Sequence, residues 1–482
     1  MRRFAGDAVL YGIGGVFTRL VALLLIPFYT RLLGASGYGI VGIADLIRNV
    51  VGAISIYTLS NTVVRFYLDF EDESSRKRFM GTLWLTSTLA VITLCAAANL
   101  AGPRYFEVLF PGISYFPYGQ YMLGISCLFA TMGVPLGLLR ARLLSKRYAG
   151  AQMLVASLTA AGTLTGLFVY GSVAGVLKGQ FVALVVASPF LMAVLRNELR
   201  LALVWGELVR VWRFASPLIV VLLASVVLNL SGRAIVNQFS TLAQVGVFTL
   251  GFQIGAIPNM VVNAADTAWF PVFARNVDNR AMLSRLLTYF VGSVFISTLF
   301  TISLGPALVR IVATEEFYGA ICLIPWFSTA FLLLGLSIPS QTVLMYHKRT
   351  ARLGWIHVLV VATYLTLVMF LVPRHGALGA AISTCGAYFV NVPMCLLLSR
   401  RLQDLRFECK RILKLVVVGV LAVGLLSVVR VDEPIPEVLI RGTGLSVLLT
   451  LGLGICRFAT DEEKRLLRNA TRSILHAPRP ST

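Results

Sequence analysis

Six charged residues stand inside long apolar stretches of this 482-residue sequence: Arg19, Arg48, Lys178, Asp7, Asp45 and Asp266. If these stretches cross a membrane, each charge costs roughly 2.5–3.5 kcal/mol on insertion scales, so each needs a compensating role. Asp45 and Arg48 are three residues apart and share one face of a helix. These residues are the candidates for chemistry inside a bilayer.

The three basic residues predict an anion-binding passage. One carboxylate cannot neutralise Arg19, Arg48 and Lys178, which leaves net positive charge in the first part of the chain. Arginine suits a phosphate because its planar guanidinium donates two parallel hydrogen bonds. We therefore expect these cations to line a cavity and bind an anionic substrate. The alternative is that Asp45 and Arg48 form an ion pair that only permits their burial.

The three acidic residues suggest a second role, the coupling of transport to an ion. Asp45, Asp7 and Asp266 are each able to bind Na⁺ or H⁺ from within the bilayer. Simple pairing between helices explains each of them equally well, so both interpretations stay open.

The usual patterns of a catalytic site are missing from the sequence. The four histidines show no HExxH spacing, and no GxxxxGK[ST] loop is present to bind a nucleotide. We therefore predict a protein that is not an enzyme and that has no catalytic residue, metal site or cofactor. Its energy must come from an ion gradient, the membrane potential or the gradient of its substrate.

The composition predicts an all-α multi-pass membrane protein. Hydrophobic residues make up 57% of the chain and charged residues only 13%, an excess that needs a bilayer as solvent. About twenty apolar residues cross the hydrocarbon core as a helix. On that rule we predict fourteen spans, at 7–31, 38–63, 79–101, 116–140, 150–170, 173–195, 214–236, 244–272, 284–309, 319–345, 354–373, 376–399, 412–429 and 437–456.

The distribution of basic residues predicts that both termini lie in the cytoplasm. With the N-terminus inside, 32 of the 42 Lys and Arg residues fall in cytoplasmic segments and seven in outer segments. They recur in short groups between apolar runs, so the net charge of +21 does not indicate a nucleic-acid-binding face. We expect a protein of the cytoplasmic (inner) membrane.

An internal repeat divides the chain into two similarly oriented lobes. Four pairs of matching segments lie 202 to 210 residues apart: 3–5 with 213–215, 146–147 with 348–349, 170–175 with 375–380, and Pro189 with Pro393. We predict an N-lobe of six helices at 1–205, a C-lobe of six at 206–405, and a closing helix pair with a cytoplasmic tail at 406–482. Such a parallel repeat is typical of transporters that work by alternating access. The alternative is that similar loops recur because the topology itself is repetitive.

Segments Gly12–Leu20, Ile26–Gly34 and Gly37–Gly39 resemble the start of bacterial polysaccharide transporters, and Gly376–Ala381 is similar to the same family. These are the O-antigen and exopolysaccharide flippases of the multidrug/oligosaccharidyl-lipid/polysaccharide flippase superfamily. The resemblance implies a flippase that moves an undecaprenyl-diphosphate-linked oligosaccharide to the outer leaflet for cell-surface polysaccharide synthesis. It also implies a cationic cavity for the diphosphate, to which Arg19 belongs by motif. Its partners would be membrane lipids, a polysaccharide polymerase and glycosyltransferases.

Three other functions are alternatives to a polysaccharide flippase. A peptidoglycan-precursor flippase binds the same lipid diphosphate. A cation-coupled multidrug exporter would want acidic cavity residues, whereas the buried balance here is basic. A membrane glycosyltransferase or polymerase usually carries a large extracytoplasmic loop, which this sequence lacks.

Overall fold

The computed structural model describes most of the chain: residues 2–52, 62–63, 66–67, 72–196, 198–200, 202–206, 209, 227–228, 231–277, 279–347, 349–403, 407–428 and 433–455. Side chains are described for these residues except 2–13, 267–268, 270–271 and 350.

The described residues form helices joined by turns, without a strand among them. This confirms the predicted all-α fold class. The helices are α1 (Arg2–Gly52), α3 (Glu73–Leu109), η3 (Tyr115–Gly119), α4 (Gln120–Thr131), α5 (Gly133–Ala141), α6 (Ser145–Tyr170), α7 (Val173–Ala193), α9 (Leu242–Gly255), α10 (Ile257–Arg275), α11 (Arg280–Val312), η4 (Glu315–Cys322), α12 (Ile324–Tyr346), α13 (Thr350–Arg400), α14 (Cys409–Val428) and α15 (Pro434–Ile455).

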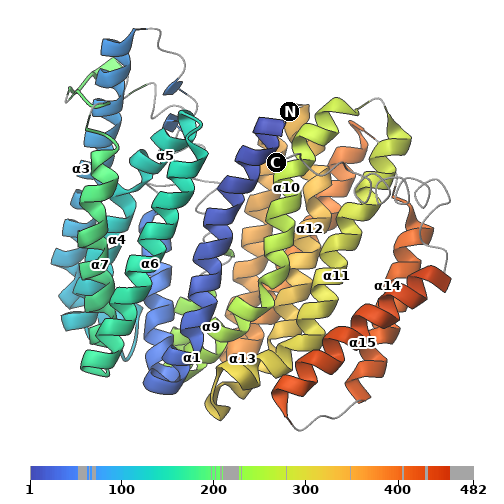
Figure 1. Ribbon diagram of the computed structural model, residues 1–482. Helices are drawn as coiled ribbons and strands as arrows, with labels where there is room; N and C mark the ends of the chain where they lie inside the picture. Colours follow the sequence, from blue (N-terminus) through green and yellow to red (C-terminus); the bar gives the residue numbers. More distant parts are fainter. Residues whose placement is uncertain are drawn as a thin grey trace, which may run out of the picture.

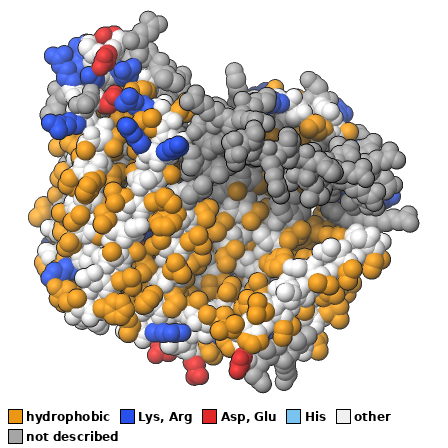
Figure 2. All heavy atoms as spheres, in the orientation of Figure 1, with side chains coloured by type: hydrophobic (Ala, Val, Ile, Leu, Met, Phe, Trp, Pro, Cys, Tyr) orange, Lys and Arg blue, Asp and Glu red, His pale blue; other side chains and the backbone are white. Residues whose placement is uncertain are grey.

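Ten of the described helices are long and apolar enough to cross a membrane, or eleven if the bent pair α9 and α10 forms one span. On the face shown in Figure 2, hydrophobic side chains cover most of the middle of the described part, and most of the charged side chains lie toward its two ends. The chain is a multi-pass membrane protein. The count of fourteen spans stays a prediction, because the predicted span 214–236 lies largely outside the described residues.

Two of these long helices are each broken at a glycine. Gly34 in α1 has φ 65° and ψ −176°, and Gly376 in α13 has φ 54° and ψ −131°. A residue with a Cβ is strained at such positive φ values, whereas glycine adopts them readily. Both glycines fall at predicted boundaries between spans, and the ribbon of α1 changes direction there, far from the marked N-terminus (Figure 1). We call the part of the molecule around Gly34, where α1 contacts Val312 and Glu316, the Gly34 end.

The helices are arranged in two bundles with α1 and α9 between them. Figure 1 shows α3 to α7 on one side and α10 to α13 on the other, with α14 and α15 along the outer flank of the second bundle. Helix α1 packs against α4 and α6 as well as against α9. We call α1 together with α3 to α7 the first bundle, and α9 to α13 together with η4 the second bundle; the lobe boundaries at 205 and 405 stay predictions.

The two bundles meet through close contacts between α1 and α9. A Cβ added at Gly39 would overlap the carbonyl oxygen of Leu242, and one at Gly246 would overlap that of Ala35. A Cβ added at Gly42 would likewise overlap the hydroxyl oxygen of Thr249. The two backbones therefore approach each other as only glycine allows.

Polar contacts reinforce this junction at the Gly34 end. The Thr30 hydroxyl donates to the Val312 carbonyl oxygen at 2.7 Å. Immediately after Gly34, the amide of Ala35 donates to a Glu316 carboxylate oxygen at 3.0 Å. This carboxylate from the second bundle satisfies a free N–H at the start of a helical segment in the first bundle. The bundles are held together at the Gly34 end by both packing and hydrogen bonds.

We predict that Gly246→Ala disrupts this junction, because its methyl group has no space beside Ala35. Overpacking of this kind costs about 1–3 kcal/mol, which thermal unfolding of the purified protein would detect as a lower midpoint. Gly150→Ala is the matched control, since it lies within α6 with no heavy atom in contact with the added Cβ. Equal midpoints for the two variants would contradict the close α1–α9 contact.

Candidate functional site

A cavity of about 380 Å³ lies beside the junction of the two bundles. Helices α1, α4, α6 and α7 form most of its wall, and α9 contributes from the second bundle. Apart from three charged side chains, its polar lining consists of hydroxyls and amides: Thr18, Tyr29, Tyr38, Asn49, Tyr148, Gln152, Thr159, Thr163, Gln180, Thr249 and Gln253. The charged residues among the described lining are Asp45, Arg48 and Arg140, which together carry a net positive formal charge.

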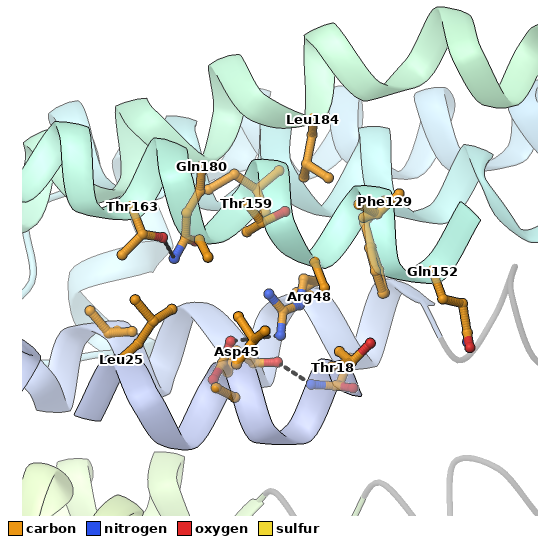
Figure 3. Close-up of a pocket in the computed structure, with 18 of the residues that line it drawn as sticks. Thr18, Leu25, Asp45, Arg48, Phe129, Gln152, Thr159, Thr163, Gln180 and Leu184 are labelled. Carbon is orange, nitrogen blue, oxygen red and sulfur yellow. Dashed lines mark hydrogen bonds and ion pairs between the residues drawn. The ribbon is translucent and has the colours of Figure 1, made fainter. Parts of the chain in front are cut away.

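Arg48 and Asp45 lie on the cavity wall as an ion pair. A terminal nitrogen of Arg48 is 2.8 Å from an Asp45 carboxylate oxygen, and both side chains are about three-quarters buried, with 26% and 28% exposed. The guanidinium also lies 5.3 Å from the centre of the Phe129 ring. Figure 3 shows Arg48 pointing away from α1 toward the helices that carry Thr159 and Leu184.

The ion pair leaves part of the Arg48 guanidinium free. Its Nε is buried and has no hydrogen-bond partner, although a buried polar group without a partner costs free energy. The pairing predicted from the three-residue spacing is therefore present, with one N–H of the guanidinium left without a partner. Binding of an anionic substrate by Arg48 stays a prediction.

A buried amide joins three helices at another part of the wall. The Nε2 of Gln180 on α7 donates to the Thr163 hydroxyl on α6 at 3.1 Å and to the Tyr29 hydroxyl on α1 at 3.3 Å. The Gln180 side chain is 7% exposed. Figure 3 shows the Gln180–Thr163 bond across the cavity lining. The sequence analysis missed this group, because a neutral glutamine in a span carries no charge to mark it.

Tyr38 connects the cavity wall to the second bundle. Its buried hydroxyl donates to the Gln253 side-chain oxygen on α9 at 2.8 Å, and its ring lies 5.7 Å from that of Tyr29. The polar lining and the junction between the bundles are therefore parts of one continuous set of contacts.

Two further polar groups, Arg140 and Gln152, line the cavity, and Gln152 lies on the opposite side of Arg48 from Gln180 (Figure 3). Arg140 is exposed at the end of α5, and the Nε2 of Gln152 donates to the Tyr148 hydroxyl at 3.2 Å. The buried Oε1 of Gln152 has no hydrogen-bond partner. Arg140 was not predicted as a site residue, although its place at the end of the predicted span 116–140 was an available signal.

Three of the other predicted site residues, Arg19, Lys178 and Asp266, are not among the residues that line this cavity. Arg19 is exposed beside the lining residue Thr18, and Lys178 is exposed with its Nζ 3.1 Å from the Tyr170 hydroxyl. Asp266 is exposed on α10. Asp7 belongs to α1, and its side chain is outside the described part of the chain. Their roles in substrate or ion binding stay predictions.

Carboxylates, thiols and imidazoles are scattered rather than grouped in the described parts of the chain. No three of them lie close enough together there to hold a metal ion.

A family model described as "Polysaccharide biosynthesis protein" matches residues 5–277, more than half of the chain. The chain belongs to this family. The resemblance expected from residues 12–39 is thereby confirmed. No curated protein matches the chain as a relative.

Solved structures of transporters share the fold of this family member. A lipid II flippase, MurJ, in an inward closed conformation has a TM-score of 0.76 at 13% identity, covering 93% of this chain and 98% of its own. An inward-facing multidrug resistance transporter of the MATE family has a TM-score of 0.61 at 13% identity, with 82% and 94% covered. A MOP superfamily transporter from Pyrococcus furiosus has a TM-score of 0.56 at 13% identity, with 83% and 95% covered. The fold is that of MurJ and MATE transporters.

We predict that Gln180→Leu destabilises the wall, because it leaves the Thr163 and Tyr29 hydroxyls without their amide donor. A buried hydrogen bond lost in this way costs about 1–3 kcal/mol. Ser188→Ala on the same helix is the control, since the Ser188 hydroxyl bonds only the Leu184 carbonyl of its own helix. Thermal unfolding midpoints would show a clear drop for the first variant alone; a drop of the same size in both would contradict the bridging role.

Proposed function

We propose that the protein is a flippase that moves an undecaprenyl-diphosphate-linked oligosaccharide across the cytoplasmic membrane, for cell-surface polysaccharide synthesis. The observation that carries the proposal is Arg48, a guanidinium on the wall of the cavity whose buried Nε has no partner. Family membership and the fold shared with a lipid II flippase support it.

The chemistry of the lining suits a sugar diphosphate. A guanidinium binds phosphate oxygens with charge-assisted hydrogen bonds, which are stronger than neutral ones. Neutral amides such as Gln152 and Gln180 offer both donors and acceptors to sugar hydroxyls. The Phe129 ring beside Arg48 gives an apolar surface for a sugar face. A lipid-linked phosphate and its first sugars therefore find matching groups in one cavity.

The junction at the Gly34 end fits one step of alternating access. The bundles are joined there by the α1–α9 contact and by Glu316, whereas Arg140 at the far part of the cavity is exposed. With both termini in the cytoplasm, as the basic residues predict, this state is closed on the outer side. Rocking of the two bundles would then break the junction and release the substrate outward.

A peptidoglycan-precursor flippase is the second candidate, favoured by the TM-score of 0.76 with the lipid II flippase. Arg48 would bind the diphosphate of that lipid in the same way. A cation-coupled drug exporter is less well supported, because among the described residues of the cavity wall the only carboxylate, Asp45, is already paired with Arg48. A polymerase and glycosyltransferases would be the partners of the first candidate.

We predict that Arg48→Gln weakens the binding of undecaprenyl diphosphate to the purified protein at least tenfold and lowers surface polysaccharide at equal protein levels. Asp45→Asn should preserve or tighten binding, because it frees the guanidinium for the ligand. Charge-assisted hydrogen bonds of about 1.5–3 kcal/mol account for the expected loss.

A purely structural ion pair would behave differently. Both single changes would then reduce stability and export to the same extent, and the double variant Asp45→Asn/Arg48→Gln would recover both. That recovery would overturn the proposal, whereas persistent loss in the double variant supports it.

A further inference from the structure

A second arginine, Arg233, is buried behind the cavity wall. It lies in the helical segment 231–239 that precedes α9, and its side chain is only 4% exposed. Its Nη1 reaches the carbonyl oxygen of Gly42 at 3.4 Å, and its guanidinium lies 5.7 Å from the centre of the Phe252 ring. The Nε is buried with no hydrogen-bond partner.

The charge of Arg233 is poorly compensated in this state. Among the described residues no carboxylate forms an ion pair with it, although Asp45 attracts it electrostatically. Asp45 is already paired with Arg48, so a single carboxylate serves two guanidinium groups. An unpaired buried charge costs several kcal/mol. Its burial therefore raises the free energy of this state relative to a state in which the guanidinium meets an anion.

The position of Arg233 indicates that it would meet an anion in a state in which the two bundles are separated at the Gly34 end. Gly42, to which it donates, lines the cavity, and Gly42 packs directly against Thr249 in the α1–α9 junction. Arg233 belongs to the chain segment leading into α9, on the far side of that junction. Separation of the bundles at the Gly34 end would remove Gly42 from the guanidinium and open it toward the cavity.

We propose that Arg233 is a second phosphate-binding residue, covered by Gly42 in the state described and exposed to the lipid diphosphate when the Gly34 end opens. This inference rests on the proposed function. Arg48 holds the diphosphate while the junction is closed, and Arg233 shares it once the junction parts. The diphosphate supplies the counter-charge that the closed state denies to Arg233, so substrate binding favours opening.

The test compares Arg233→Met, Arg233→Lys and Arg48→Gln in the full-length protein. We expect the Met variant to unfold at the same or a higher temperature than the parent, because an unpaired buried charge is gone. We also expect it to bind undecaprenyl diphosphate within threefold of the parent, yet to lower surface polysaccharide at least tenfold. The Lys variant, which keeps the charge, should export clearly more than the Met variant.

Arg31→Met is the matched control. Arg31 also donates to a single backbone carbonyl of the second bundle, at 3.3 Å from Ile311, but it is exposed. Its replacement should change export less than twofold.

Each other outcome overturns the inference. Normal export by Arg233→Met would show that the charge is not needed, and a lower unfolding temperature with no advantage for Lys would show a packing role. Unchanged binding in Arg48→Gln would instead overturn the proposed function, whatever the Arg233 variants do.

Discussion

The sharing of one carboxylate between two guanidinium groups is the constraint on which this structure depends. Asp45 forms an ion pair with Arg48 on the cavity wall and also attracts Arg233 from across the junction of the bundles. Taking charges out of water is costly, and one negative charge cannot balance two positive ones. In the proposed function, a lipid-linked diphosphate supplies the anion that balances this positive excess. Substrate binding would then be linked to the relation of the two bundles through the same few side chains.

The glycines of α1 and α9 make that link possible. Because Gly39, Gly42 and Gly246 carry no side chain, the two backbones approach closely enough for Arg233 to reach the Gly42 carbonyl oxygen. The break at Gly34 leaves the amide of Ala35 without a partner in its own helix. This amide donates a hydrogen bond to the carboxylate of Glu316 in the other bundle. The junction combines these backbone contacts and hydrogen bonds with buried apolar side chains from both bundles, among them Tyr38 and Phe317, whose ring centres are 5.8 Å apart.

Much of the fold was predictable from the sequence because a bilayer imposes simple rules. Length and hydropathy placed the helices, and the glycines at the predicted span boundaries, Gly34 and Gly376, are where the long helices break. The Asp45–Arg48 pair followed from a three-residue spacing on one helix face. Family membership followed from residues 12–39 and is borne out by the match over residues 5–277.

The composition of the site was harder to predict, because periodicity does not reveal which face of a span turns toward the cavity. Thr18 lines the cavity and its neighbour Arg19 does not, although one residue is only a 100° turn of the helix. Neutral groups such as Gln180 gave no signal at all. Arg233 was not predicted as a site residue, although it falls within the predicted span 214–236, and its burial involves contacts with α1, some 190 residues earlier in the chain.

The most direct test of a cavity built for a lipid-borne phosphate is a comparison of undecaprenyl diphosphate with undecaprenol, which has the same chain and no charge. Affinities of the purified protein for both would be measured in the same lipid nanodiscs. We expect the diphosphate to bind at least tenfold more tightly than undecaprenol, and we expect rising salt to reduce this difference in affinity. Equal affinities would show that the protein recognises only the polyprenyl chain of the lipid and would contradict a phosphate-binding cavity.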